Sequence, residues 1–399
     1  MKAIIRTFQA GMGDCIFFLL DDGEVRKATM IDCGKYTDDI RQYVENELGK
    51  HIDILVVTHI DNDHVDGIVE MLEQTPDLRI DKILYNCNQL WDGLQKEHAS
   101  EVLQKDMQIL RANLPARQKS ENGKIKADKA VTLAEKIAGN DAWWQAWIKN
   151  EYITKDTKPI PLDEHNDRFG QFTVLTPTKA EIDKLNKKFR VEYSRLTKHI
   201  IDAGGNVEGK ETLFELVARV VAMKRTNYEV MEPVKTGAIN ILDETRLQDA
   251  FEFEPKKVTD ENEASIALMW ECHNKKVLFM GDAEPNEVAE RIKEYFGGGK
   301  HEVEAIKVSH HGSKHSTSKL LTERVDSSHY FFTGGNMKDK PSLAAVMKIT
   351  KRGDSRNRIL HFNNAENEIV KALVSEQGCD VRNQYHIEIA ERNEYQFEY

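Results

Sequence analysis

Short apolar runs alternate with polar turns along the first part of the chain, and these runs are rich in β-branched and aromatic residues. Runs of this length and composition, bounded by glycine turns, predict strands. They are residues 4–10, 15–20, 27–32, 53–58 and 83–88. Residues 37–48 and 65–72 instead repeat apolar positions with a helical period. We therefore expect strands and helices to alternate here, as in an α/β domain.

The same alternation returns in the last third of the chain. The predicted strands are residues 264–271, 275–281, 303–309, 329–335 and 358–363. The predicted helices are residues 285–296, 317–325, 342–350 and 366–375. Between the two α/β parts, residues 89–165 and 178–257 are rich in charged side chains and have a helical period, and a predicted strand at 169–177 separates them. We expect a single α/β domain over residues 1–399, with these two regions as helical insertions.

The composition fits a packed soluble protein, with 40% hydrophobic and 31% charged residues. No apolar run approaches the roughly 20 residues that a membrane span needs, and the N-terminus lacks a signal-peptide layout. We expect a cytoplasmic protein with no membrane partner. The five cysteines are scattered and form no CxxC pair, so neither disulfides nor a cysteine zinc site is expected. The net charge of −11 argues mildly against non-specific nucleic-acid binding.

Four metal-ligand side chains lie within six residues, between a buried predicted strand and a predicted helix. They are His59, Asp61, Asp63 and His64. Neutral imidazole and ionised carboxylate both bind first-row divalent metals, and one strand-to-helix loop brings them to one point. The alternative is a polar surface turn. The two flanking histidines favour a metal site.

Two later strand ends carry further candidates. Asp282 follows strand 275–281, where the alternative is an ordinary turn or a helix N-cap. His310 and His311 follow strand 303–309 and precede Ser313 and Lys314. This pattern suits a metal ligand next to side chains that bind an anion. The alternative is a polar loop without a function.

Two carboxylates near the N-terminus are candidates for a supporting role. Asp14 ends the turn Gly11-Met12-Gly13, and Asp32 ends the strand at 27–32. In metal sites, a carboxylate that does not touch the metal often accepts a hydrogen bond from a ligand histidine and so orients its ring. Asp32 is our candidate for this role. A hairpin with a terminal Asp is the competing interpretation.

The order of these motifs resembles the metallo-β-lactamase superfamily, and it is most similar to the nuclease-like soluble domain of competence DNA-uptake channel proteins and their stand-alone relatives. The matching segments are FQAGMGDCIFF, TMIDCG, VVTHIDNDHVDG, NEASIALMW, VLFMGDAEP and IKVSHHGSKHSTS. The resemblance implies an αββα sandwich, here with two helical insertions. It also implies two divalent metal ions, Mn²⁺ or Zn²⁺, at one edge between the sheets, and hydrolysis of phosphodiesters.

The resemblance also implies roles for individual residues. It gives His59 and Asp61 to the first metal, Asp63 and His64 to the second, Asp282 to both, and His310 to the second site. The residues implied to act on the substrate are Asp63, His311, Ser313 and Lys314.

The chain departs from the superfamily pattern at three points. Asp61 stands where HxHxDH has its second histidine, which predicts an oxygen-rich and weaker first site. His165 is the only nearby candidate for the ligand histidine between the HxDxDH and GD motifs. Lys340-Pro341 replaces the late HP dipeptide of the subgroup.

These observations predict a hydrolase in which a metal-activated hydroxide attacks a phosphodiester of a nucleic acid or nucleotide. Three alternatives stay open. One is a hydrolase of the same fold acting on a cyclic nucleotide or an ester. Another is a protease-like or regulatory subunit of a bacterial defence system, with the insertions docking a protein partner. The third is a scaffold without activity.

Overall fold

The computed structural model describes residues 1–86, 133–148, 151–163, 168–185, 187, 242–335 and 337–399. The predicted insertions, residues 89–165 and 178–257, lie partly outside these ranges, and His165 lies outside them entirely. The end of the predicted strand at 83–88 also lies outside the described residues. In the described parts of the two insertions, the chain forms short helices and the short strand β6.

The N-terminal part of the chain builds most of a six-stranded sheet, and strand β16 (Glu394–Glu398) from the C-terminal end of the chain joins it at one edge. In spatial order its strands are β16, β1 (Lys2–Thr7), β2 (Cys15–Asp21), β3 (Arg26–Cys33), β4 (His51–Val57) and β5 (Arg79–Tyr85). Strands β1 and β2 form an antiparallel hairpin in which Ile5 faces Phe18. Strands β3, β4 and β5 run parallel, so their carboxyl ends meet at one edge.

The second sheet has eight strands among the described residues. In spatial order they are β15 (Ile387–Ile389), β14 (Arg358–Phe362), β13 (His329–Phe332), β11 (Ala305–Lys307), β9 (Lys275–Phe279), β8 (Ala267–Cys272), β7 (Gln171–Thr176) and β6 (Ile160–Pro161). Strands β9, β11, β13, β14 and β15 are parallel to their neighbours in this series. A separate pair, β10 (His301–Val303) and β12 (Val325–Ser327), lies beside this sheet.

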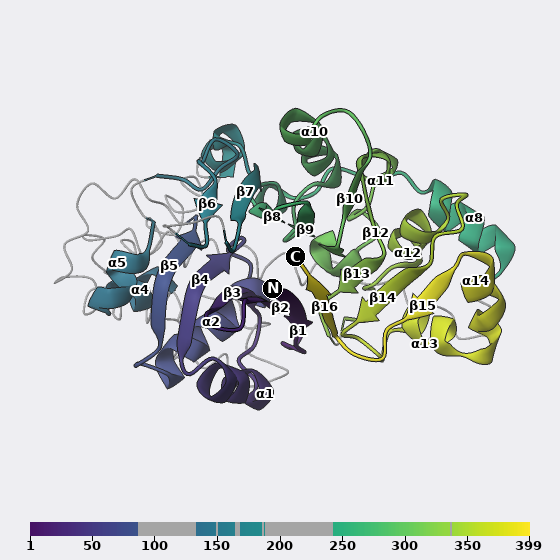
Figure 1. Cartoon of the computed structure of the whole chain (residues 1–399). Helices are drawn as coiled ribbons and strands as arrows, with labels where there is room; N and C mark the ends of the chain where they lie inside the picture. The colour runs from purple at the N-terminus through teal and green to yellow at the C-terminus, as the bar shows by residue number, and fades with distance from the viewer. Residues whose placement is uncertain (87–132, 149–150, 164–167, 186, 188–241, 336) are drawn as a thin grey trace, which may run out of the picture.

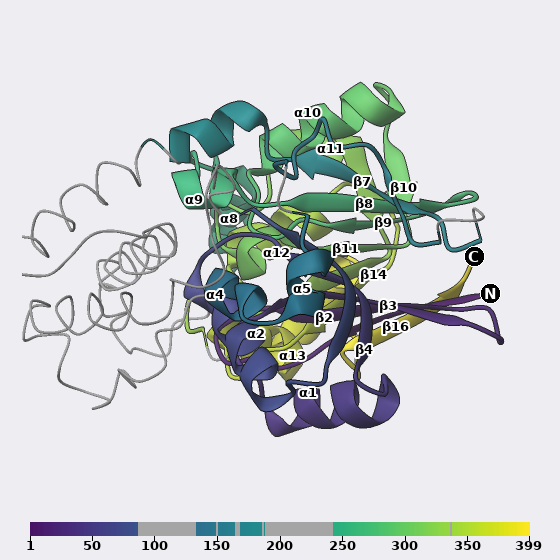
Figure 2. The ribbon, with the colours of Figure 1, turned by 90° about the vertical axis from the view of Figure 1, so that its left-hand side faces the viewer.

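Helices cover the outer faces of both sheets (Figures 1 and 2). Those of the first sheet are α1 (Asp38–Gln42), a π-helical turn (Tyr43–Glu47), α2 (Asn62–Gln74), α4 (Leu133–Ala138) and α5 (Asp141–Ala146). Those of the second sheet are α8 (Glu244–Glu252), α10 (Pro285–Phe296), α11 (Lys319–Arg324), α12 (Leu343–Thr350), α13 (Glu368–Val374) and α14 (Cys379–Gln384). Further short helical elements among the described residues are α9 (Asp260–Glu263), the 3₁₀ turns Ser309–Gly312 and Glu376–Gly378, and the helical residues 179–185.

Three apolar cores separate these four layers. The central core lies between the two sheets, where Phe18 of β2 packs edge-on against Trp270 of β8 and Phe279 of β9. Alternate residues of β2 point to opposite faces, so Phe17 and Leu19 enter the outer core instead. A strand that buries both faces reads as a continuous apolar run, as CIFFLL does.

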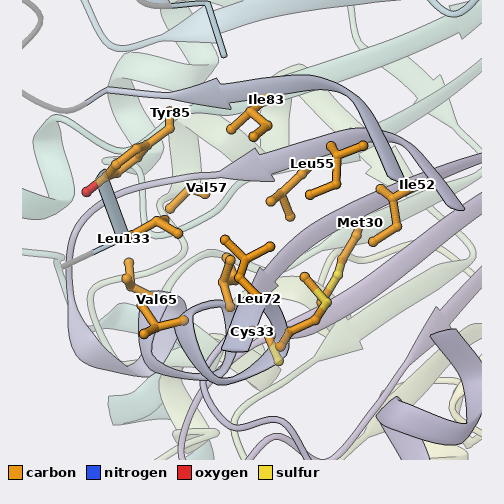
Figure 3. Close-up of a cluster of buried hydrophobic side chains, with 14 of the residues drawn as sticks. Met30, Cys33, Ile52, Leu55, Val57, Val65, Leu72, Ile83, Tyr85 and Leu133 are labelled. Carbon is orange, nitrogen blue, oxygen red and sulfur yellow. The ribbon is translucent and has the colours of Figure 1, made fainter. Parts of the chain in front are cut away.

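The outer core of the first sheet is shown in Figure 3. Met30 of β3 and Leu55 and Val57 of β4 meet Val65 and Leu72 of helix α2 there. A matching core joins the second sheet to its helices, with Met269 and Tyr330 against Val288 and Met347 among its members. Two sheets packed face to face with helices outside form the αββα sandwich that the family resemblance implied.

The predicted elements agree with the observed ones in most of the described chain. Helix α10 has the bounds that the sequence predicted, 285–296, and strands β1 to β5 overlap their predicted runs. The sequence interpretation missed β12, α14, β15 and β16. Strand β16 pairs with β1, with Lys2 opposite Glu398, so the two termini lie side by side (Figure 1).

None of the helices in the described part of the chain combines the length and apolar character that crossing a membrane requires.

Candidate metal centre

The candidate site lies where several strands of both sheets end. Asp32 lies near the end of β3, and His59 follows β4. Asp282 follows β9, and His311 follows β11. Since β3 and β4 are parallel and β9 and β11 are parallel, each pair delivers its side chains to one edge. This topology brings residues more than 200 positions apart into one buried space.

The first group of ligand atoms surrounds Asp282. His59 Nε2 lies 3.7 Å from Asp61 Oδ2 and 3.9 Å from Asp282 Oδ2. Two ligand atoms about 2.1 Å from a tetrahedral metal are themselves about 3.4 Å apart. The observed separations are slightly wider than that value. His59 Nε2 thus lies near both carboxylates, and the potential ligand atoms of His59, His64 and Asp282 all lie within 4.8 Å of one another.

The second group shares Asp282 with the first. His64 Nε2 lies 3.5 Å from Asp282 Oδ1 and 3.9 Å from Asp63 Oδ2. His311 Nε2 lies 3.2 Å from Asp63 Oδ2. The potential ligand atoms of Asp63, His64 and His311 all lie within 4.8 Å of one another. The geometry thus places Asp282 between two groups of ligands.

The ligand histidines His59, His64 and His311 are each held in place through Nδ1, the ring nitrogen that faces away from the ligand atoms. His64 Nδ1 donates to Asp32 Oδ2 at 2.7 Å, and His311 Nδ1 donates to Asp14 Oδ1 at 2.8 Å. His59 Nδ1 lies 3.1 Å from the Thr58 hydroxyl. A proton on Nδ1 leaves the Nε2 lone pair free to bind a metal. Asp32 and Asp14 therefore have the geometry of carboxylates that orient ligand histidines.

Several buried atoms of the site have no hydrogen-bond partner among the described residues. They are His59 Nε2, His64 Nε2, Asp61 Oδ1 and Asp282 Oδ1. Asp61 is also the N-cap of helix α2, but its side chain accepts no capping bond. Buried polar atoms without partners are costly, and a cation supplies the missing interaction. The donor set therefore fits divalent metal ions.

Charge in the buried space supports the same fit. Five carboxylates gather here, those of Asp14, Asp32, Asp61, Asp63 and Asp282, and the ammonium of Lys307 pairs with Asp14 and lies near Asp282. If all five are ionised, they outnumber the ammonium groups of Lys307 and Lys340. Divalent ions would offset this excess of negative charge, and without metal, protons on the histidines offset part of it.

The histidines and carboxylates shift one another's protonation. Burial opposes the charged form of His64, but Asp282 and Asp32 raise the pKa of His64 well above its usual range. Burial also opposes ionisation of Asp282, yet His64 and His310 lower the pKa of Asp282 well below its usual range. Metal binding at these histidines must displace protons, so metal affinity falls as pH falls.

Lys307 is buried in the wall of the site. Its ammonium forms an ion pair with Asp14, donates to Gly281 O at 2.8 Å and lies 3.8 Å from Asp282 Oδ1. Burial lowers the pKa of a lysine, but Asp14 and Asp282 reverse that effect here and raise the pKa of Lys307. Lys307 thus ties the turn that carries Asp14 to the turn that carries Asp282.

Gly13 allows the first hairpin to reach the site. A Cβ at Gly13 would lie 1.6 Å from Asp63 O and 2.8 Å from Gly34 Cα. The next residue, Asp14, donates its backbone N–H to Asp63 O at 3.1 Å. Only glycine fits this close approach, which explains the glycine of the GMGD turn.

His310 lies differently from the residues that sequence analysis grouped with it. Its Nε2 accepts from Lys340 Nζ at 2.7 Å and lies 3.7 Å from Asp282 Oδ2. Its Nδ1 lies 3.3 Å from the Asn262 amide. Burial and Lys340 lower the pKa of His310 to about 3. His311, by contrast, is fully buried with Nε2 toward Asp63, so it has the ligand geometry that we had expected of His310.

The other expected substrate contacts lie around this turn. Lys314 is exposed, and its ammonium lies 5.9 Å from the centroid of the Phe253 ring. The Ser313 hydroxyl is buried and accepts from the backbone N–H of His315 at 3.3 Å. Both side chains thus have interactions away from the ligand atoms.

Sequence analysis missed Lys307, Asn262 and the role of Lys340. One signal for Lys307 was available, because a lysine inside the apolar run VEAIKVS is unusual for a buried strand. Asn262 reaches the site from helix α9 and Lys340 from a loop, and only the folded chain brings these two segments together.

Residues 11–80 match the sequence model of the metallo-beta-lactamase superfamily. This stretch contains Asp14, Asp32 and the whole HIDNDH segment. Among curated proteins, no sequence matches the chain. This stretch of the chain is thus similar to the metallo-β-lactamase superfamily, whose members are mainly metal-dependent hydrolases, and the αββα architecture is consistent with that fold.

Solved structures of three proteins are among those similar to this chain. Zn(2+)-bound PqqB from Methylobacterium extorquens is 12% identical, with a TM-score of 0.39 and 100% of each chain covered. A diphosphatase of the PhnP family is 10% identical, with a TM-score of 0.34 and coverage of 100% of this chain and 98% of that one. A CmlA beta-hydroxylase mutant is 10% identical, with a TM-score of 0.35, and this chain spans only 54% of its length.

Proposed function

We propose that this protein is a metal-dependent hydrolase that cleaves phosphodiesters in a nucleic acid or a nucleotide. The observation that carries the proposal is the convergence of unpartnered buried ligand atoms in one space. A histidine and aspartate set of this kind suits a two-metal hydrolytic centre. The similarity of the motif order to the nuclease-like domain of DNA-uptake proteins supports a phosphodiester as the substrate.

Two groups of residues are proposed to hold the metal ions. The first group is His59, Asp61 and Asp282, and the second is Asp63, His64, His311 and Asp282. The first group contains a single imidazole, and its other ligand atoms are carboxylate oxygens. Oxygen ligands suit Mn²⁺ and Mg²⁺, whereas imidazole suits Zn²⁺. We therefore expect Mn²⁺ to support activity better than Zn²⁺.

The residues around the ligands prepare the site for hydrolysis. When bound, two divalent ions supply a water whose pKa is lowered from about 15.7 towards 7, and they polarise the phosphoryl oxygen. Asp32 and Asp14 keep the Nε2 atoms of His64 and His311 turned to the centre. Asp63, whose side chain is 25% exposed, is the carboxylate proposed to accept a proton from the attacking water.

The remaining parts of the proposal concern the organisation of the chain. We propose one catalytic domain over residues 1–399, with residues 89–165 and 178–257 inserted in it. These two regions contain none of the motifs that carry the resemblance. They are proposed to cover the site or to dock a protein partner, as in a regulated cytoplasmic enzyme.

A metal and substrate panel tests the proposal. Metal-stripped protein would be reloaded with Mn²⁺ or Zn²⁺, and its metal content measured by mass spectrometry. Turnover would then be compared on single- and double-stranded DNA and RNA, bis-nitrophenyl phosphate, a cyclic dinucleotide and nitrophenyl acetate. We expect up to two ions per chain and cleavage of phosphodiesters. Binding of no metal, or turnover of the carboxylic ester alone, would overturn the proposal.

A further inference from the structure

Lys340 brings a positive charge to the candidate metal centre from the loop before helix α12. Its Nζ donates to His310 Nε2 at 2.7 Å. The same Nε2 lies 3.7 Å from Asp282 Oδ2, the carboxylate between the two ligand groups. The ammonium of Lys340 therefore lies next to the ligand atoms, separated from them by one imidazole.

The loop that carries Lys340 is fixed at several points. The Asn364 side-chain amide donates to Met337 O and, at 3.1 Å, to Lys340 O. On the other side, Ser342 donates its backbone N–H to Gly312 O at 2.8 Å. The loop is thus tied both to the region before helix α13 and to the turn that carries the two histidines. A cation presented on such a loop loses little conformational entropy when it binds a ligand.

The ammonium of Lys340 has spare binding capacity. Lysine has three N–H donors, and His310 takes one of them. Within the part of the chain that the structure describes, no carboxylate forms an ion pair with Lys340, and no acceptor other than His310 bonds its Nζ. Nearby lysines differ, since Lys307 pairs with Asp14 and Lys319 with Glu252.

Two bound metal ions would repel the nearby ammonium of Lys340, because like charges repel strongly at short distance. An anion bound between them would offset this repulsion. We propose that Lys340 binds a non-bridging oxygen of the substrate's phosphoryl group, with His310 holding the ammonium in position. This inference rests on the proposed function and names the side chain that binds the substrate's phosphoryl oxygen. It also moves the anion-binding role from Lys314, whose ammonium lies over Phe253, to a lysine that contacts the site.

Phosphate binding tests this role without turnover. Metal-loaded wild-type protein and Lys340→Met would be titrated with inorganic phosphate by calorimetry, and the metal content of both would be measured. A charge-assisted hydrogen bond accounts for about 10- to 100-fold in affinity. We expect Lys340→Met to weaken phosphate binding by that factor while keeping its metal, and Lys340→Arg to bind within a few-fold of wild type.

Lys338→Met is the matched control, because Lys338 is exposed on the same loop. It should bind phosphate as the wild type does. In kinetics, Lys340→Met should raise KM for bis-nitrophenyl phosphate, and Lys338→Met should not. Unchanged phosphate affinity in Lys340→Met, an equal loss in Lys338→Met, or loss of metal from Lys340→Met would each overturn the inference.

The two proposals fail separately. If the wild type cleaves no phosphodiester, the proposed function falls, and the phosphate titration still decides whether Lys340 binds an anion. If phosphodiesters are cleaved but Lys340→Met matches the wild type in phosphate affinity and KM, only the role of Lys340 falls.

Discussion

At the scale of single residues, Asp282 has the most demanding position because it lies between both groups of ligands. We expect Asp282→Asn to stay folded, to hold less metal and to lose at least about 100-fold in hydrolysis, as removal of a main electrostatic contributor does. Asparagine keeps the shape but loses the charge that offsets two dications. Metal stoichiometry and kcat would be measured beside the exposed control Asp249→Asn. Full metal content with near-normal turnover would refute the two-metal arrangement.

Asp61 sets the expected metal preference. Its carboxylate lies 3.7 Å from His59 Nε2, at a position where an imidazole is usual in the superfamily. Asp61→His replaces an oxygen ligand by nitrogen, so we expect relative activity to shift from Mn²⁺ towards Zn²⁺. The variant would be stripped of metal and reloaded with Mn²⁺ or with Zn²⁺. The measurement is its turnover rate with Mn²⁺ divided by its turnover rate with Zn²⁺. A ratio equal to that of the wild type would contradict this assignment of Asp61.

Lys307 is expected to matter for stability as well as for the site. Lys307→Met would leave Asp14 buried with its cation removed, and breaking a buried ion pair costs about 3–5 kcal/mol. Urea unfolding of the metal-free protein measures this loss. Lys275→Met is the matched control, since its pair with Glu304 is partly exposed and should contribute at most about 1 kcal/mol. The double variant with Asp14→Asn should recover part of the stability.

At the scale of elements, strands β13, β14 and β16 bring the rings of His329, His361 and Tyr395 together, and His329 is expected to titrate. His329 stacks on Tyr395 and its Nδ1 donates to His361 Nε2 at 3.0 Å. Burial, with a smaller effect of His361, lowers the pKa of His329 to about 4 from 6.5. The unfolded chain then binds more protons between these values, so stability falls as pH falls through that window.

The contribution of His329 to this loss is about 2 kcal/mol, discounted for its partial exposure. His329→Phe keeps the ring stack but removes the proton site. Its unfolding free energy should therefore depend less on pH between about 6.5 and 4 than that of the wild type. The exposed variant His386→Asn should keep the wild-type profile. An unchanged slope in His329→Phe would show that His329 is not the titrating group.

The sequence predicted elements well where a strand buries both faces or a helix has clear limits. CIFFLL reads as a strand because both faces of β2 are covered, and Pro285 marks the start of helix α10. Strands β15 and β16 are short edge strands, and the sequence interpretation missed them although residues 387–389 and 394–399 alternate polar with apolar or aromatic residues. Their pairing with β14 and β1 comes from contacts distant in sequence.

The site was predictable as far as local motifs extend. Asp32 ends a recognisable strand, and the HIDNDH segment and Asp282 each follow one, so the parallel topology of each sheet brings its side chains to one edge. Which of His310 and His311 turns to the centre was not predictable, because both have positive φ values and the turn sets their directions. Lys340 was equally hidden, since its position depends on bonds from Ser342 to Gly312 and from Asn364.

At the scale of the whole molecule, the metal ions are expected to join the two halves of the sandwich. His59, Asp61, Asp63 and His64 come from the first sheet's side, and Asp282 and His311 come from the second. In the metal-free protein their carboxylates repel one another across the space between the sheets. Ions that bind only the folded chain stabilise it, by about 2.7 kcal/mol at a free concentration 100-fold above Kd.

Removal of metal should therefore lower the unfolding midpoint of the whole protein. We expect chelated protein to unfold several degrees below protein saturated with Mn²⁺ or Zn²⁺, because the ligands come from both sheets and only the folded chain assembles them. Calorimetry on both forms measures the difference. Asp282→Asn should lose most of the metal-dependent shift, while Asp249→Asn should keep it. Equal midpoints for chelated and metal-saturated wild type would mean that the carboxylates and histidines between the sheets do not hold an ion.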